Sequence, residues 1–228
     1  MSELVFDLLG VEPEPYAASP TLNFGLRISE TTGIRIHAIL LRIQIRIEPK
    51  RRRYSPAEAE RLLDLFGETK RWGDTVKPMQ FAFADAAIPG FDGSIEVDVA
   101  VPCTYDFEVA SAKYFHALDE GEIPLLMLFS GTVFTKGEGG FAVEQVPWHK
   151  EISFGVPVAT WDKLMDLYFP GQAWVRMQRE TLDGLQRFKS HRGLTGWDET
   201  LTVLLEAAGD SGAGAPGKAE PERPVVHE

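Results

Sequence analysis

Carboxylates alternate along the segment around residue 97, where Glu96 and Asp98 share one face of a predicted strand. Asp106 and Glu108 have the same spacing, and we expect them on the next strand. Two or four carboxylates on one sheet face could perform glycosidic acid–base chemistry or bind calcium. The same alternation is typical of any half-exposed strand. We therefore expect a solvated sheet face, and the alternative function is a small hydrolase or a calcium-dependent binder.

The one cysteine, Cys103, follows a proline at the end of that strand pattern. A thiol nucleophile needs a neighbouring base and a group that orients the base. No sequence feature supplies them, so we expect a buried structural thiol. The five histidines show no metal-ligand spacing. They are His37, His116, His149, His191 and His227. The sequence thus predicts no catalytic residue, no metal ligand and no cofactor.

Lys50, Arg51, Arg52 and Arg53 form a basic run in an otherwise acidic chain. The run stands where a long strand pattern ends and a helix pattern begins. A solvated loop with local ion pairs would explain it, but a compact positive patch can also steer an acidic partner. We therefore predict that Arg51, Arg52 and Arg53 contact a partner protein.

A second predicted contact is the apolar cluster Val5, Phe6, Leu8 and Leu9. Acidic residues and prolines surround the cluster, so we expect residues 1–19 to form a flexible arm. Short apolar anchors of this kind often dock into grooves of other proteins. The alternative is that the arm folds back onto its own domain.

Composition limits the classes of function that the chain can have. The sequence has 228 residues and a net charge of −11. Because such a chain repels phosphate groups, we do not expect it to bind nucleic acids in general. One cysteine cannot form an intramolecular disulfide, which fits a reducing cytoplasm. The first residues lack the basic region of a signal peptide, and no apolar window approaches the length of a membrane span. We expect a cytoplasmic protein.

The clearest structural element in the sequence is a strand pattern over residues 34–47, in which β-branched residues alternate with polar ones. The apolar parity changes near residues 38–40, which predicts a bulge or a section covered on both faces. Residues 104–118 fit either a strand or a helix, and we interpret them as a strand. Further strand patterns cover 21–30, 79–83, 94–101, 123–135 and 141–146.

Helical patterns interrupt and then follow the strands. Ser55, Pro56 and Glu58 have the arrangement of a helix start, and they predict an inserted helix near residues 55–66. Residues 159–208 show helical spacing, and residues 209–228 are small, polar and proline-rich, which predicts a disordered tail. The fold class that follows is mainly β with C-terminal helices (α+β). It is an antiparallel immunoglobulin-like β-sandwich over 20–158, with one inserted helix and a packed C-terminal helical segment.

Three strings carry a family resemblance: LLRIQIRIEPKRRRYSPAEAERLLDLFGE at 40–68, VDVAVPCTYDFEVASAKYFHALDEGEIPLLMLFSGTVF at 97–134 and WDKLMDLYFP at 161–170. Over about residues 20–207 they resemble a bacterial family known only as a domain of unknown function. The resemblance transfers no catalytic residue. Members of that family are associated with uptake nickel–iron hydrogenase gene clusters, so the resemblance implies a hydrogenase component as the partner. Residues 123–135 are also weakly similar to strands of SecB-like export chaperones.

Together these features predict a non-catalytic cytoplasmic accessory or scaffold protein that binds another protein. The resemblance implies a role in the assembly or docking of a hydrogenase. The alternatives are the small hydrolase or calcium-dependent binder that uses the sheet carboxylates, and a SecB-like holding chaperone.

Overall fold

The computed structural model describes residues 2–104, 106, 109–137, 140–172 and 175–209. The chain divides into two compact units, residues 1–176 and residues 177–228. The first unit contains the strands and the second contains two helices. Apart from Gly209, the predicted disordered tail lies outside the described residues.

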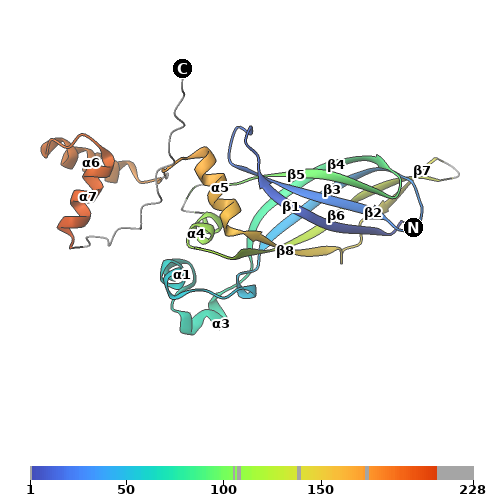
Figure 1. The fold of residues 1–228 in the computed structure, drawn as a ribbon, viewed down its shortest axis with the longest axis horizontal. Coiled ribbons are helices and arrows are strands. Elements are labelled where there is room, and N and C mark those ends of the chain that lie inside the picture. The colour runs from blue at the N-terminus through green and yellow to red at the C-terminus, as the bar shows by residue number, and fades with distance from the viewer. Residues whose placement is uncertain (1, 105, 107–108, 138–139, 173–174, 210–228) are drawn as a thin grey trace, which may run out of the picture. The chain divides into compact units, whose positions relative to one another are not determined.

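The described strands form two antiparallel sheets (Figure 1). The smaller sheet has the strand order β1 (Leu4–Pro13), β2 (Thr21–Glu30), β5 (Ser94–Pro102). The larger sheet has β4 (Met79–Phe91), β3 (Ile36–Ile47) and β6 (Glu122–Gly137) side by side, and the other edge of β6 pairs with β8 (Glu151–Pro157) and β7 (Gly140–Gln145). This architecture confirms the predicted α+β fold class with an antiparallel β-sandwich.

The core lies between the two sheets and is built from every second residue of the long strands. Burying one such side chain stabilises the fold by about 1.5–3 kcal/mol. The inward side chains of the three central strands are Leu22, Phe24, Leu26 and Ile28 from β2, Ile39, Leu41, Ile43, Ile45 and Ile47 from β3, and Ile123, Leu125, Met127 and Phe129 from β6. The strand predicted at 34–47, with one buried face, is therefore confirmed over Ile36–Ile47.

Two irregularities where β3 meets β6 also follow from the sequence. The register shifts between Ile36, which pairs with Thr135, and Ala38, which pairs with Phe134, so the predicted bulge is confirmed. Opposite Leu41, Gly131 has a φ of 148°, and a Cβ atom there would overlap the carbonyl oxygen of Leu40. Only glycine permits this close approach of the two backbones.

The flexible arm expected at residues 1–19 is wrong for the part that forms β1. Leu4 and Phe6 are buried and Leu8 packs against the core, because these three residues share the inward face of the strand. The loop after β1 is also held, since the Tyr168 hydroxyl donates hydrogen bonds to the carbonyl oxygens of Glu14 at 2.7 Å and Ala17 at 3.0 Å. The alternative interpretation, in which the segment folds back onto its own domain, agrees with the structure.

The strand expected at residues 104–118 is also wrong. The segment contains the helix α4 (Ala110–His116), and residues 105, 107 and 108 lie outside the described part. The helix forms because its apolar residues find partners from distant segments. The ring of Phe115 packs edge-on against Trp161, with centroids 4.8 Å apart, and against Phe81 at 5.1 Å.

The remaining helices of the first unit gather at one end of the sandwich (Figure 1). The predicted helix near 55–66 is two short helices that break at Leu62, and Ser55 with Glu58 forms the predicted capping box. The last helix packs on β1 and β8, so it belongs with the sandwich and not with a separate segment that starts at residue 159. These helices are η1 (Pro49–Arg51), α1 (Pro56–Arg61), α2 (Leu63–Phe66), η2 (Thr69–Arg71), α3 (Trp72–Thr75) and α5 (Val158–Tyr168).

The second unit is a helical hairpin of α6 (Arg179–His191) and α7 (Trp197–Ala207), which contact each other. Gly193 follows α6 with a φ of 65°, the left-handed conformation that commonly terminates a helix. In the described part of the chain, no helix combines the length and the apolar character that crossing a membrane requires.

Candidate functional site

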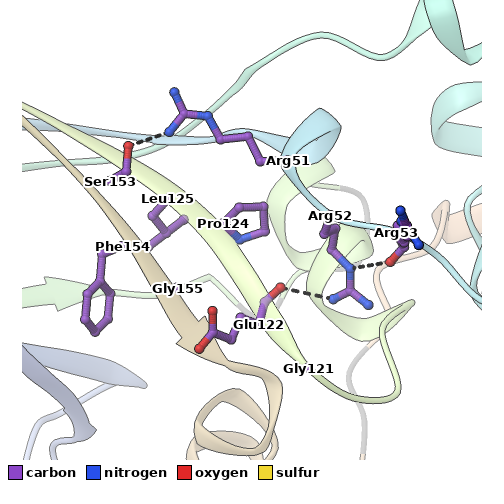
Figure 2. A pocket seen from close by; sticks show the side chains of 10 residues that line it. All are labelled: Arg51, Arg52, Arg53, Gly121, Glu122, Pro124, Leu125, Ser153, Phe154 and Gly155. Atoms are coloured by element: carbon purple, nitrogen blue, oxygen red, sulfur yellow. Dashed lines mark hydrogen bonds between the residues drawn. The ribbon is translucent and has the colours of Figure 1, made fainter.

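The arginines of the predicted basic run line an open pocket of about 440 Å³, here called the arginine pocket (Figure 2). Its lining residues are Arg51, Arg52, Arg53, Gly121, Glu122, Pro124, Leu125, Ser153, Phe154 and Gly155. Pro124 pairs with Gly155 and Leu126 pairs with Ser153. Leu125 lies between Pro124 and Leu126 on β6 and points into the core. Pro124, Leu126 and their partners on β8 therefore lie on the opposite, outer face of the larger sheet. That outer face forms the floor of the pocket.

Local backbone contacts place the arginines at the rim of the pocket. Where β3 ends, the Glu48 amide donates a hydrogen bond to the Pro124 carbonyl oxygen at 2.9 Å, which holds the chain against β6. The Arg51 amide then donates to the Glu48 carbonyl oxygen at 2.9 Å and closes the turn of η1. The next residues must therefore pass over the end of β6 and β8.

Arg52 connects three segments of the chain. Its guanidinium donates to the Glu58 carboxylate at 2.6 Å and to the carbonyl oxygens of Glu120 and Glu122 at 3.2 Å each. It also lies 5.1 Å from the ring centroid of Tyr54. The Arg52 side chain is 11% exposed and that of Glu58 is 3% exposed. With its donors used in this way, Arg52 holds the pocket wall in place.

Arg51 and Arg53 are both exposed. Arg51 extends along the sheet and donates a hydrogen bond to the Ser153 hydroxyl (Figure 2). Within the described residues, the side chain of Arg53 makes no hydrogen bond or ion pair. These two guanidinium groups therefore supply the available positive charge of the pocket.

Glu122 is the acidic residue in the lining, and its carboxylate is turned toward Gly155 (Figure 2). A Cβ atom at position 155 would overlap that carboxylate. Because Gly155 has no side chain, the Glu122 carboxylate can lie against the sheet at this position.

The second predicted contact site is divided by the pleat of β1. Val5 and Leu9 are 40% and 46% exposed on the outer face of the smaller sheet, whereas Phe6 is 7% exposed in the core. Leu8 is half-buried against the same core. The prediction that Phe6 contacts a partner is therefore wrong. The structure does not bring Val5 and Leu9 together with the arginines, because Val5 and Leu9 lie on the smaller sheet, whereas the arginines line a pocket with residues of β6 and β8 in the larger sheet.

The predicted carboxylate arrangement is present only in part. Glu96 and Asp98 share the outer face of β5, and Glu96 pairs with Arg27 at 2.6 Å. Asp106 lies before α4 instead of on a neighbouring strand, and Glu108 lies outside the described residues. Asp106 therefore does not extend the carboxylate face of β5, because it does not lie on a strand. Over the described ranges, no group of three or more His, Cys, Asp and Glu residues could hold a metal ion.

Cys103 is buried, as predicted. Burial raises the pKa of its thiol to about 12, although a hydrogen bond from the backbone of Leu22 acts in the opposite direction. A thiol with this pKa is almost entirely protonated at neutral pH, and the thiolate is the reactive form. The observation agrees with a structural role.

Comparison with known families adds a decisive match. The chain matches the model of DUF6084, a family of unknown function, over residues 1–213. The protein belongs to this family. The match confirms the resemblance to a domain of unknown function, and it covers both sheets as well as the helical hairpin of this DUF6084 chain.

Solved structures and curated proteins add little to the DUF6084 assignment. A protein from Bordetella pertussis that is assigned as ApaA is 14% identical, with 68% of this chain and 95% of that chain covered at a TM-score of 0.26. A β-glucosidase from Kluyveromyces marxianus is 8% identical, with 68% and 15% covered at a TM-score of 0.24. No curated protein matches the sequence. At these TM-scores neither likeness supports an inference.

Sequence reasoning missed the residues that support the arginines. Ser153 lies far from Arg51 in the sequence, and no local sequence pattern indicates that the two side chains meet. Tyr54 and Tyr114 share a hydrogen bond of 2.8 Å between their hydroxyl oxygens, and burial raises the pKa of Tyr54 to about 12. Glu58 did leave a signal, because its position in the capping box is visible in the sequence. Its second role as the partner of Arg52 was not visible.

Proposed function

We propose that this protein is a non-catalytic accessory or scaffold protein of the cytoplasm that binds another protein, and that the arginine pocket receives an acidic segment of that partner. One observation carries the proposal. Arg51 and Arg53 present exposed guanidinium groups at the rim of an open pocket, and the third arginine is fixed by Glu58.

The chemistry of arginine favours recognition over catalysis at this place. A guanidinium group keeps its charge throughout the physiological pH range, so it cannot act as a general acid or base there. Its planar fork of donors matches the two oxygens of a carboxylate. The groups that dominate the pocket therefore suit the binding of acidic side chains.

The charge of the whole chain strengthens this interpretation. On a protein with a net charge of −11, a positive site is a local exception. Opposite charges at such a site accelerate the encounter with an acidic partner and help to exclude basic ones. Binding through this pocket is thus expected to weaken as the salt concentration rises.

The pocket is also partly pre-organised. Arg52 is held by Glu58 and by two carbonyl oxygens, so the wall loses little freedom when a partner binds. Arg51 already donates to the Ser153 hydroxyl across the floor. A partner carboxylate can replace this neutral acceptor with a charged one, and charge-assisted hydrogen bonds are the stronger kind.

The family resemblance implies which partner to examine first, namely a component of an uptake nickel–iron hydrogenase. The test is affinity capture from native cells with the intact protein and with the double variant Arg51→Glu/Arg53→Glu. A matched control is Arg35→Glu/Lys70→Glu, which changes the charge equally at two exposed side chains outside the pocket.

We expect the intact protein and the control to recover the same partner, and the pocket variant to recover at least about tenfold less, which corresponds to about 1.4 kcal/mol. Recovery by the intact protein should also fall between about 50 and 500 mM salt. Equal recovery by all three forms would show that the pocket is not the interface.

A further inference from the structure

We propose that the bound segment continues from the arginine pocket as an extended, apolar stretch across the outer face of the larger sheet, where its side chains lie on Leu40, Phe83 and Leu128. This inference rests on the proposed function, because the pocket holds the acidic end of the segment. It adds the chemistry and the course of the rest of the segment.

The strand register places the three apolar residues on one surface. Gln44 of β3 pairs with Phe83 of β4 on one side and with Leu128 of β6 on the other, so these residues form one row across the sheet. Leu40 lies on the same face of β3, two rows beyond Gln44, and the row between them contains Arg42 with its partners Asp85 and Ser130. The apolar side chains therefore come from three neighbouring strands and lie on either side of this polar row.

The same register connects this surface to the arginine pocket. Leu126 of β6 pairs with Arg46 on one side and with Ser153 on the other. Ser153 is the residue that accepts the hydrogen bond from Arg51. Since Leu126 and Leu128 are two residues apart, the row of Phe83 is the next outward row along the sheet from the row that forms the pocket.

Two of the three side chains are well exposed on the sheet face, whereas Leu128 is half-buried. Leu40 is 56% exposed and Phe83 is 52% exposed. Scattered exposed apolar residues are normal, but a group in line with a charged pocket marks an interaction surface. Figure 1 shows the helices of the first unit at the end of the sandwich.

The charges on this face indicate what kind of segment it accepts. Arg42 lies 5.2 Å from the centroid of the Phe83 ring and 3.8 Å from Asp85, and Arg46 lies 3.4 Å from Glu48. These arginines are compensated within the sheet, whereas the guanidinium groups of Arg51 and Arg53 at the pocket are not. The complementary segment is therefore acidic at the pocket and apolar over the sheet.

The dimensions of the sheet set the length of the segment. From the row of Leu126 to the row of Leu40, which pairs with Thr132, β6 advances by six residues, or about 20 Å. An extended peptide covers this distance with about six residues, and alternate side chains face the sheet. The expected ligand has acidic residues at one end, followed by apolar residues that face the rows of Phe83 and Leu40.

The experiment uses a display library of random peptides of about ten residues, selected on the intact full-length protein. The affinities of the enriched peptides are then measured by fluorescence anisotropy for four forms of the protein. These are the intact chain, Arg51→Glu/Arg53→Glu, Leu40→Thr/Phe83→Thr and the matched control Leu63→Thr/Leu167→Thr. The control removes two apolar side chains of similar exposure from α2 and α5.

We expect the enriched peptides to combine an acidic end with apolar residues that can face the rows of Phe83 and Leu40. Their Kd should rise at least about tenfold for the arginine variant and for the Leu40/Phe83 variant, and by less than about twofold for the control. Peptides in which serine replaces the apolar residues should lose the same factor on the intact protein. This second measurement does not depend on how any protein variant folds.

Two results would contradict the inference, and they differ in what they mean for the pocket. If only the arginine variant weakens binding and the serine peptides bind normally, the apolar surface is not used, although the pocket still functions. If the enriched peptides lack acidic residues and bind all four forms equally, the sheet surface and the proposed function of the pocket both fail.

Discussion

The ring of Phe6 lies parallel to the ring of Phe129, with their centroids 4.3 Å apart and an angle of 6° between their planes. Phe6 comes from β1 in the smaller sheet and Phe129 comes from β6 in the larger one. The stacked pair therefore joins the two sheets inside the core. A segment that reads as a loose arm in the sequence thus helps to hold the sandwich together.

Replacing this ring should be costly. We expect Phe6→Ala to lower the free energy of unfolding by about 3–5 kcal/mol, because it removes a buried ring and leaves a cavity. Val5→Ala changes the neighbouring, outward residue and should stay within about 0.5 kcal/mol. Urea unfolding followed by tryptophan fluorescence measures both values. Similar effects of the two changes would contradict the burial of Phe6.

Arg52 should behave as a structural residue, unlike the other two arginines of the pocket. Arg52→Ala leaves the enclosed Glu58 carboxylate without its charged partner and should destabilise the protein by about 3 kcal/mol. Arg53→Ala, at an exposed position, should change stability by less than about 0.5 kcal/mol. Thermal unfolding of both variants provides the comparison. If the two alanine variants melt alike, Arg52 does not hold the pocket wall.

Glu30 should make stability depend on pH in the acidic range. Burial raises the pKa of its carboxyl group, but hydrogen bonds from Thr32, the Glu3 amide and the Ile34 amide outweigh this effect and lower the pKa from 4.5 to about 2. Because the folded state has the lower pKa, the ionised carboxylate stabilises the fold above pH 4.5. This contribution is lost progressively as the pH falls toward 2.

The variant Glu30→Gln tests this expectation. It should be less stable than the intact protein at pH 7, and the difference between the two should shrink as the pH is lowered below 4.5. Glu12→Gln, at an exposed position of β1, controls for the loss of one negative charge. Urea midpoints measured from pH 7 to pH 2.5 give the comparison. A difference that stays constant over this range would show that Glu30 is not held ionised by its neighbours.

Two glycines of the helical hairpin should respond in opposite ways to alanine. Gly184 lies inside α6, where an added Cβ has only the end of the Arg187 side chain within reach, so Gly184→Ala should stabilise the helix by up to about 1 kcal/mol. Gly193 has a φ of 65°, and Gly193→Ala should destabilise the hairpin by about 1–2 kcal/mol. Amide hydrogen exchange within α6 and α7 reports on this unit directly. Changes of the same sign would mean that the helix boundaries are misplaced.

The strength of the local pattern decided which elements the sequence could predict. The alternation in β3 is long and regular, so the strand and its bulge follow from the sequence. In β1 the register shifts between Leu8 and Gly10, and this irregularity interrupts the alternation after only five residues. Inward and outward residues then appear in the sequence as one apolar cluster, in which Phe6 and Val5 cannot be told apart.

Residues that depend on distant contacts were beyond the reach of the sequence. The segment around Tyr114 fits two periodicities, and the helix is selected by the packing of Phe115 against Phe81 and Trp161. The arginine pocket likewise combines a part that the local sequence indicates and a part that depends on distant strand pairing. Its arginines are evident as a basic run, but its floor exists only because Leu126 of β6 pairs with Ser153 of β8.

The position of β3 between β4 and β6 has a consequence for the synthesis of the chain. β4 is the next strand of the chain after β3, whereas the residues that pair with the second edge of β3, from Leu125 to Thr135, are synthesised later. At translation rates of about 5–20 residues per second, this edge stays open for roughly 5 to 20 seconds on the ribosome. An open edge of apolar, β-branched residues is a template for pairing with other chains. The strand at the centre of the folded sandwich is therefore open to pairing with other chains until the second half of its sheet has been synthesised.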